Sequence, residues 1–260
     1  MTILDELAAY AKERTAANKA KISLADIRRM AEEMPKGEFL FENNLRKSGI
    51  SFICECKKAS PSKGLIAPDF PYLQIAKDYE AAGADCISVL TEPKWFLGSD
   101  EYLREIASSV KTPCLRKDFT VDEYMIYEAK TLGASAVLLI LSILSDEQLS
   151  EYLELSSSLG LTAIVETHDE DEVGKAIDAK SRVIGVNNRN LKDFTVNTDN
   201  SKNLRKLIPS DVLFVAESGI KTHEDVRALR EIGADAVLVG ETLMRAEDKK
   251  AMLNILRGDL

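Results

Sequence analysis

From residue 50 onward, a short apolar run, a polar loop and a helix-like segment alternate eight times along the chain. The runs are rich in Val, Ile and Leu and lack polar alternation, which is typical of strands buried on both faces of a parallel sheet. The segments between them carry helical periodicity, as in the stripe Leu73, Ile75 and Tyr79. The predicted strands are residues 50–56, 85–90, 113–116, 136–141, 162–165, 183–186, 212–216 and 236–239.

The repeated units predict one closed barrel. No Pro/Gly-rich linker or block of charge separates them over residues 50–260. Near-equal units favour an α/β fold of the (β/α)8, or TIM-barrel, type over an open doubly wound sheet, which is the alternative. Nearly the same tripeptide also joins three helical segments to the next strand, and its glycine suits a helix end in the left-handed conformation. These tripeptides are Gly83-Ala84-Asp85, Gly133-Ala134-Ser135 and Gly233-Ala234-Asp235.

Residues 1–49 precede the barrel as a helical extension, and we expect one domain overall. Ile3, Leu4 and Leu7 predict an amphipathic first helix, and residues 24–34 and 39–45 predict two further segments. The first helix could plug the bottom of the barrel or cover its mouth as a lid. The sequence favours neither alternative.

The composition limits the classes of partner. The chain has 34 Lys and Arg against 43 Asp and Glu, a formal net charge of −9. A nucleic-acid or anionic-membrane binder would show a basic field, so we expect neither partner. The longest wholly apolar run, residues 136–141, is far shorter than the ~20 residues that cross a bilayer. The start of the chain carries Asp5 and Glu6 and lacks a basic-then-apolar segment, so we expect a cytoplasmic protein.

The cysteines do not predict a metal site or a disulfide framework. Cys54 and Cys56 form the only close pair, and the two histidines lie far from all four cysteines in sequence. Each cysteine sits in an apolar run, which indicates a buried thiol. We therefore expect no bound metal.

Charged residues follow several predicted strands, at the end where a barrel of this kind carries its chemistry. They are Glu55, Lys57, Lys117, Glu166 and Glu217. Because strand side chains alternate, the two ions of the first strand share one face and its cysteines the other. Charged side chains that face the barrel axis must pair with opposite charges to offset the cost of their desolvation. Such clusters shift pKa values and often mark active sites. We predict an active site here.

A second cluster suits a phosphate group. Ser218-Gly219 follows the seventh strand and Gly240-Glu241 the eighth, the usual phosphate-binding loops of this fold. Glycines let backbone N–H groups approach a ligand, whereas the carboxylate of Glu241 must point away from it. The loop 57–64 adds three lysines and two hydroxyls near the same mouth.

Four other residues carry less information. His168 and the acidic stretch 169–172 are interpreted as a solvated helix start, and His223 as a surface residue of a first helical turn. Trp95 and Phe96 either pack a loop or wall an apolar pocket. Two histidines in these contexts do not build a catalytic triad.

The strand-end segments resemble the indole-3-glycerol-phosphate synthase family, lyases of tryptophan biosynthesis. The similarity covers nearly the whole chain, including the N-terminal helix. Cys56 replaces the larger aliphatic residue usual in the family, but it is predicted to face away from the site. The matching segments are Glu55-Cys56-Lys57-Lys58-Ala59-Ser60-Pro61-Ser62-Lys63-Gly64, Leu90-Thr91-Glu92 with Phe96 and Gly98-Ser99, Leu115-Arg116-Lys117-Asp118-Phe119, Ile164-Val165-Glu166, Gly185-Val186-Asn187-Asn188-Arg189-Asn190-Leu191, Glu217-Ser218-Gly219-Ile220 and Val239-Gly240-Glu241.

The resemblance implies a carbon–carbon lyase, or decarboxylase, that needs no cofactor. The family closes a ring on 1-(2-carboxyphenylamino)-1-deoxyribulose 5-phosphate and releases carbon dioxide and water. The resemblance assigns the acid for ring closure to Lys117. It gives Lys57 the binding of the substrate carboxylate and, as an alternative left open, the role of a second acid. Glu166 is implied as the base for dehydration, with its pKa raised if the pocket is dry.

Other implied roles concern orientation and binding. Glu55, Asn187 and Glu217 would orient the lysines and the substrate hydroxyls, and Arg189 would contact a hydroxyl or support a neighbour. The phosphate positions are Ser60, Ser218, Gly219, Gly240 and Glu241, and the ring wall is Phe96, Phe119 and Leu138.

Three rival functions remain open at this point. A phosphoribosylanthranilate isomerase shares the phosphate loops but uses a Cys/Asp pair. A Schiff-base aldolase would need a deprotonated lysine nucleophile. A non-catalytic barrel that binds a phosphorylated metabolite would not need an acid–base set. In every case the expected partner is a small phosphorylated molecule, and we expect a monomer because no helix face demands a partner.

Overall fold

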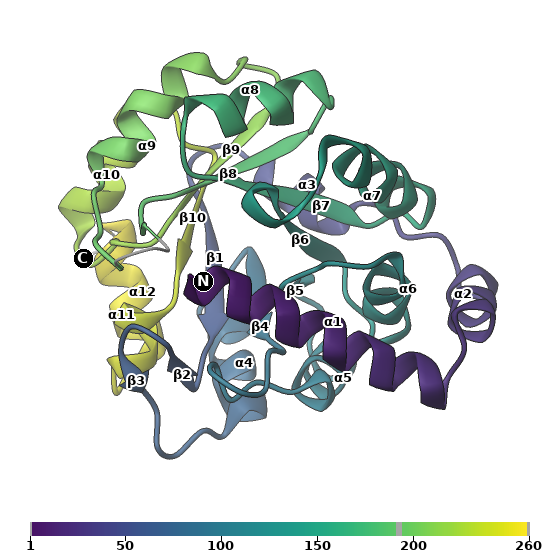
Figure 1. Cartoon of the computed structure of the whole chain (residues 1–260). Coiled ribbons are helices and arrows are strands. Elements are labelled where there is room, and N and C mark those ends of the chain that lie inside the picture. Colours follow the sequence, from purple (N-terminus) through teal and green to yellow (C-terminus); the bar gives the residue numbers. More distant parts are fainter. Residues whose placement is uncertain (1, 191–193, 259–260) are drawn as a thin grey trace.

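The computed structural model describes residues 2–190 and 194–258. Within them, eight parallel strands close into a barrel in the order β1-β10-β9-β8-β7-β6-β5-β4 (Figure 1). Closure confirms the TIM-barrel prediction over the open sheet. Each predicted apolar run overlaps one strand, and the ends differ by two residues at most. The strands are β1 (Ser51–Cys56), β4 (Cys86–Leu90), β5 (Cys114–Lys117), β6 (Ala136–Ile140), β7 (Thr162–Thr167), β8 (Val183–Asn187), β9 (Leu213–Glu217) and β10 (Ala236–Val239).

Helices between the strands form the outer layer (Figure 1). Gly83, Gly133 and Gly233 have φ values of 79°, 85° and 81°, so the repeated tripeptide does end three helices in the left-handed conformation as predicted. The helices are α4 (Tyr72–Ala81), α5 (Asp100–Ser109), α6 (Glu123–Thr131), η1 (Leu141–Ile143), α7 (Asp146–Ser158), α8 (Glu170–Asp178), α9 (Asp199–Leu204), η2 (Arg205–Leu207), α10 (His223–Glu231), α11 (Glu241–Arg245) and α12 (Lys249–Arg257). None of the helices in the described ranges is long and apolar enough to cross a membrane.

A short hairpin in the loop after β1 was not predicted. It pairs β2 (Ala59–Ser60) with β3 (Gly64–Leu65) in antiparallel fashion. Two-residue strands are too short to show an alternating pattern, so the sequence gives no signal for them. The hairpin carries Ser60 and Lys63 to the barrel mouth.

The core has two shells, one inside the barrel and one between sheet and helices. Ile53 packs in the inner shell, whereas Cys54 and Cys56 pack in the outer one, which confirms the predicted division of β1 into two faces. All four cysteines are buried free thiols. Burial raises the pKa of the Cys114 thiol to about 12, which leaves it unreactive.

The N-terminal extension supplies both a plug and a lid. Its helices are α1 (Ile3–Lys21), α2 (Leu24–Glu33) and α3 (Leu40–Leu45). In α3, Phe41 and Leu45 are buried against the inner shell, and Asn44 donates a hydrogen bond to the Asp85 carbonyl at the entry to β4. Helix α3 therefore closes the bottom. Helix α1 lies at the opposite end, where its first turns line the cavity of the barrel mouth.

Candidate active site

The carboxyl ends of the strands surround a cavity of about 1000 Å³. This is the size range of small-molecule sites and the place where barrels of this type carry their chemistry. The structure brings every residue of the predicted site to its wall. These residues are Glu55, Lys57, Ser60, Phe96, Lys117, Phe119, Leu138, Glu166, Asn187, Arg189, Glu217, Ser218, Gly219, Gly240 and Glu241.

Lys117 stands at the centre of an ion cluster in the cavity. Its Nζ lies 3.1 Å from Glu166 Oε2 and 3.3 Å from Glu217 Oε2. Both carboxylates are buried, and 15% of the lysine side chain is exposed. Burial alone would lower the pKa of Lys117, but Glu166, Glu217 and Glu55 outweigh it and raise that pKa well above its ordinary value. The ammonium is therefore fully protonated at neutral pH.

A second pair forms on β1. Lys57 Nζ lies 2.6 Å from Glu55 Oε1, and Ser88 donates to the other oxygen at 3.3 Å. Burial opposes ionisation of Glu55, but Lys57 and Lys117 overcome it and hold the pKa of this carboxyl below its usual range. Glu55 is therefore an anion that fixes Lys57 at the cavity wall.

The two carboxylates that share Lys117 differ, and the difference corrects one expectation. Burial would raise the pKa of Glu166, but Lys117, His168 and Asn187 lower it below its usual range. Burial raises the pKa of Glu217 to about 7. Lys117 is the main group that opposes this rise, and the negative charges of Glu166 and Glu55 add to it. The predicted raised pKa at Glu166 is therefore wrong, and the raised pKa belongs to Glu217. Only the structure reveals how many partners each carboxylate has.

Glycines make room for these side chains. A Cβ at Gly240 would overlap Glu55 Oε1 and lie 2.8 Å from Lys57 Nζ. A Cβ at Gly185 of β8 would lie 2.5 Å from Glu217 Oε1. The glycines thus permit ions inside a closely packed barrel.

The end of the cavity where a phosphate is predicted to bind has the expected backbone and additional positive charge. Ser218 and Gly219 have φ values of 67° and 85°, and a left-handed serine is strained by about 1–3 kcal/mol, as is common at ligand sites. Glu241 is held by Arg245 at 3.0 Å and by Lys63 at 3.9 Å, so its carboxylate is neutralised beside the site. Arg245 was not predicted, although its i,i+4 spacing from Glu241 was a usable signal.

Asn188 is a second residue that the sequence analysis did not single out. It is buried, its amide donates to the Ser218 carbonyl at 3.1 Å, and its Oδ1 accepts from the Ser201 hydroxyl at 2.8 Å. Asn188 therefore holds the strained turn at Ser218. Leu191, which closes the motif quoted for this segment, lies outside the described residues.

Part of the cavity wall is apolar. The rings of Phe96 and Phe119 lie 6.0 Å apart, and Ile3, Leu4 and Leu7 of α1 line the same cavity. This side suits a planar apolar group.

The geometry agrees with comparisons of the whole chain. A family model described as indole-3-glycerol phosphate synthase matches residues 4–256. This chain belongs to the indole-3-glycerol phosphate synthase family. The synthase of Ruminiclostridium cellulolyticum is 55% identical over 257 residues, which span 98% of this chain and 99% of that one. The synthase of Leuconostoc mesenteroides is 53% identical over 260 residues, with 99% of both chains covered.

Solved structures that are far less similar in sequence share the barrel. A 3-hexulose-6-phosphate synthase superposes with a TM-score of 0.63 at 16% identity, covering 81% of this chain and 100% of that one. A thiamine phosphate pyrophosphorylase from Pyrococcus furiosus gives a TM-score of 0.62 at 15% identity, with 82% and 96% covered. At this identity the likeness concerns the fold.

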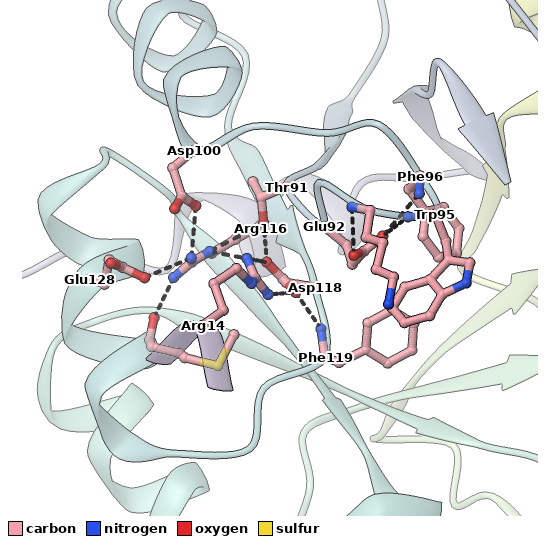
Figure 2. A network of polar contacts seen from close by, with 12 residues as sticks. Arg14, Thr91, Glu92, Trp95, Phe96, Asp100, Arg116, Asp118, Phe119 and Glu128 are labelled. Atoms are coloured by element: carbon pink, nitrogen blue, oxygen red, sulfur yellow. Dashed lines mark hydrogen bonds and ion pairs between the residues drawn. The ribbon is translucent and has the colours of Figure 1, made fainter. Parts of the chain in front are cut away.

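Within this member of the indole-3-glycerol phosphate synthase family, a buried polar network fixes α1 to the residues beside Lys117. Figure 2 shows Arg14 of α1 meeting Asp118, with two hydrogen bonds of 2.9 and 2.6 Å. Asp118 also accepts from the Thr91 hydroxyl and, at 2.8 Å, from the Phe119 backbone N–H. The helix that forms one cavity wall is thus tied to the strand end that carries the lysine.

The neighbouring loop after β4 is fixed by Glu92. Its buried carboxylate accepts backbone N–H groups of Trp95 and Phe96 at 2.8 and 2.9 Å (Figure 2). Trp95 packs edge-on against Tyr10 of α1 with ring centroids 5.6 Å apart, whereas Phe96 faces the cavity. Trp95 therefore packs the loop, and Phe96 forms part of the pocket wall, so each of the two predicted alternatives holds for one residue.

The interpretation of His168 as a solvated residue is wrong. The side chain is 17% exposed, and its Nε2 is buried 3.3 Å from Glu166 Oε1. The neighbouring Asp169 is exposed and caps α8, as the acidic stretch suggested. His223 does begin α10 but is half-buried, with Nδ1 3.2 Å from the Leu256 carbonyl.

No group of three or more His, Cys, Asp or Glu side chains within residues 2–190 and 194–258 is arranged to hold a metal ion. The carboxylates of the cavity are instead paired with lysines.

Proposed function

We propose that this chain converts 1-(2-carboxyphenylamino)-1-deoxyribulose 5-phosphate to indole-3-glycerol phosphate, carbon dioxide and water. The observation that carries the proposal is Lys117, a protonated lysine held between Glu166 and Glu217 at the centre of the cavity. The apolar wall suits the aromatic ring of the substrate, and the loops after β9 and β10 suit its phosphate.

Ring closure needs a proton for the ketone oxygen as the ring carbon attacks the carbonyl. Lys117 supplies it, because its ammonium is the donor inside the cavity that three carboxylates keep charged. Proton transfer from a positioned acid contributes typically 10²–10⁴-fold to rate. The substrate carboxylate sits against Lys57, and it leaves as carbon dioxide once the ring has become an electron sink.

Loss of carbon dioxide restores the aromatic ring. Dehydration then completes the indole: Glu166 removes a proton from the carbon next to nitrogen, and the hydroxyl leaves as water with a proton from Lys57. Paired with a charged Lys117, Glu166 is a weak base. Once Lys117 has given its proton to the alkoxide, the compensating charge is gone and the pKa of Glu166 rises. The same proton transfer that closes the ring therefore activates the base for the later step. Glu217 holds Lys117 in place throughout.

The remaining contacts bind the substrate chain. Backbone N–H groups of Gly219 and Gly240 and the Ser60 and Ser218 hydroxyls take the phosphate, while Lys63 and Arg245 supply positive charge. Asn187 and Arg189 line the same cavity, and we assign them to the sugar hydroxyls.

We also propose a cytoplasmic monomer. Four free buried thiols suit a reducing compartment. Light scattering on the purified chain tests the oligomeric state, and a dimer mass would contradict it.

The test of the proposed function is a product balance. Purified protein incubated with the substrate should release carbon dioxide and indole-3-glycerol phosphate in equal amounts. Turnover of phosphoribosylanthranilate without carbon dioxide would instead support the isomerase. A covalent adduct after borohydride treatment would support the aldolase. Thermal stabilisation by the substrate without any product would support a binding protein.

A further inference from the structure

We propose that His168 is a positioning residue that orients Glu166 and holds it in its anionic form. The inference rests on the proposed function, since it assigns a second role to the site of the base. It goes beyond the cavity-lining residues, because His168 lies behind Glu166, on the side away from Lys117.

The two oxygens of Glu166 face different partners. Oε2 faces Lys117 at 3.1 Å, whereas Oε1 accepts from the Asn187 amide at 3.1 Å and lies 3.3 Å from His168 Nε2. The His168 contact is an ion pair rather than a well-aligned hydrogen bond, as Nε2 has no hydrogen-bond partner of good geometry in the described chain. The contacts of Asn187 and His168 with Oε1 therefore leave Oε2 facing Lys117 in the cavity.

The other edge of the imidazole is fixed from outside the cavity. Nδ1 lies 3.1 Å from Glu172 Oε2, and the same carboxylate accepts the His168 backbone N–H at 2.7 Å. Ser142 donates to Glu172, and Asn200 donates to the His168 carbonyl at 3.1 Å. Ring and backbone are thus held by three separate elements, η1, α8 and α9, which is far more than a surface residue needs.

The imidazole carries a positive charge. Burial would lower the pKa of His168, but the carboxylates of Glu166 and Glu172 outweigh it and raise that pKa to about 10. Nδ1 then donates to Glu172, and the charged Nε2 edge faces Glu166 as an ion pair. The charged groups that face Glu166 are Lys117, His168 and, across Lys117, Glu217 and Glu55. Among them His168 is the cation that the chemistry does not consume.

This arrangement has a consequence for the reaction cycle. When Lys117 gives up its proton, Glu166 loses its cation in the cavity but keeps the one behind it. The imidazolium therefore limits how far the basicity of Glu166 rises, and it keeps the carboxylate ionised until the substrate proton is presented to Oε2.

The experiment compares His168→Gln and His168→Ala with His223→Gln, a matched control that changes the other histidine outside the cavity. Glutamine keeps a donor near Glu166 but removes the charge. An opposite charge at this distance shifts a carboxyl pKa by about 1–3 units. The acid limb of the kcat–pH profile should therefore move upward by about one unit or more in both His168 variants. At pH values on that limb, kcat should fall about tenfold per unit, whereas His223→Gln should match the wild type.

A purely structural role predicts a different result. The folded variants would then lose kcat with the acid limb unmoved, and that outcome overturns the proposal. Unchanged kcat and an unchanged limb also overturn it. Turnover by the wild type in the same assay separates this failure from failure of the proposed function.

A direct measurement covers the case in which a variant does not fold. His223→Gln leaves His168 as the single histidine, because the chain has two. Its ring resonances can then be titrated by NMR in an otherwise intact protein. A transition well above the ordinary histidine value of ~6.5 supports the ion pair, and a transition at or below that value overturns it.

Discussion

The N-terminal lid offers the sharpest stability prediction, because two ion pairs tie α1 to the barrel and differ mainly in burial. Arg14 meets Asp118 with 14% and 0% of the side chains exposed. Lys19 meets Asp122, 2.7 Å away, with 34% and 31% exposed. Arg14→Met removes the first pair and keeps an aliphatic stem of similar length, while Lys19→Met removes the second and serves as the control.

The magnitude follows from what each change leaves behind. Breaking a buried ion pair by removing one partner costs about 3–5 kcal/mol, because a charge remains buried. Asp118 keeps the Thr91 hydroxyl, the Phe119 N–H and Arg116, whose Nε lies 3.9 Å away. These partners reduce the expected loss for Arg14→Met to about 2–3 kcal/mol. An exposed pair contributes about 0–1 kcal/mol, so Lys19→Met should change little.

Urea denaturation followed by circular dichroism measures both losses under one set of conditions. Arg14→Met should also raise KM more than it lowers kcat, because α1 forms part of the cavity wall through Ile3, Leu4 and Leu7. Equal destabilisation by the two variants, or a loss below 1 kcal/mol for Arg14→Met, would refute the argument that burial of Asp118 decides the outcome.

Three further outcomes are expected. Lys117→Met should lose a factor of roughly 10²–10⁴ or more in kcat while remaining folded, and wild-type turnover from folded mutant would remove this lysine from the mechanism. The pKa of His168 rises from 6.5 in the unfolded chain to about 10 in the folded protein, so the stability that its charge contributes is full below pH ~6.5 and is lost as pH rises toward 10. The difference in stability between wild type and His168→Gln, measured by thermal melts at several pH values, should therefore shrink over that range. A difference that widens would contradict the ion pair. EDTA should leave turnover unchanged, since the acid and base groups are side chains, and inhibition that added metal reverses would contradict that.

The sequence predicts the barrel well because each unit obeys a local rule. Apolar runs mark the strands, and a glycine marks three of the helix ends. The strand boundaries also place Glu55, Lys57, Lys117, Glu166 and Glu217 at one end of the barrel, so a shared cavity follows from topology alone.

The parts that were missed depend on distant contacts. The sequence does not reveal that His168 turns toward Glu166 rather than toward solvent, since an acidic helix start follows it in either case. The pKa order of Glu166 and Glu217 depends on a count of partners from five strands. Arg14 and Asp118 are separated by more than a hundred residues, and no local pattern connects them.

The division of the extension into lid and plug has a similar cause. The first turns of α1 and the residues of α3 both carry apolar side chains, so composition alone does not assign either helix to one end of the barrel. The strand ends that meet each helix decide the matter, and those contacts exist only in the folded chain.

The central claim is that Lys117, set between Glu166 and Glu217, drives the conversion of the carboxyphenylamino-deoxyribulose phosphate to an indole. The most direct measurement follows indole fluorescence after this compound is mixed with catalytic amounts of wild type or of Lys117→Met in EDTA buffer. The account predicts a steady rise for the wild type and a rate at least roughly a hundredfold lower for the variant. No rise from folded wild-type protein that binds the compound would contradict it.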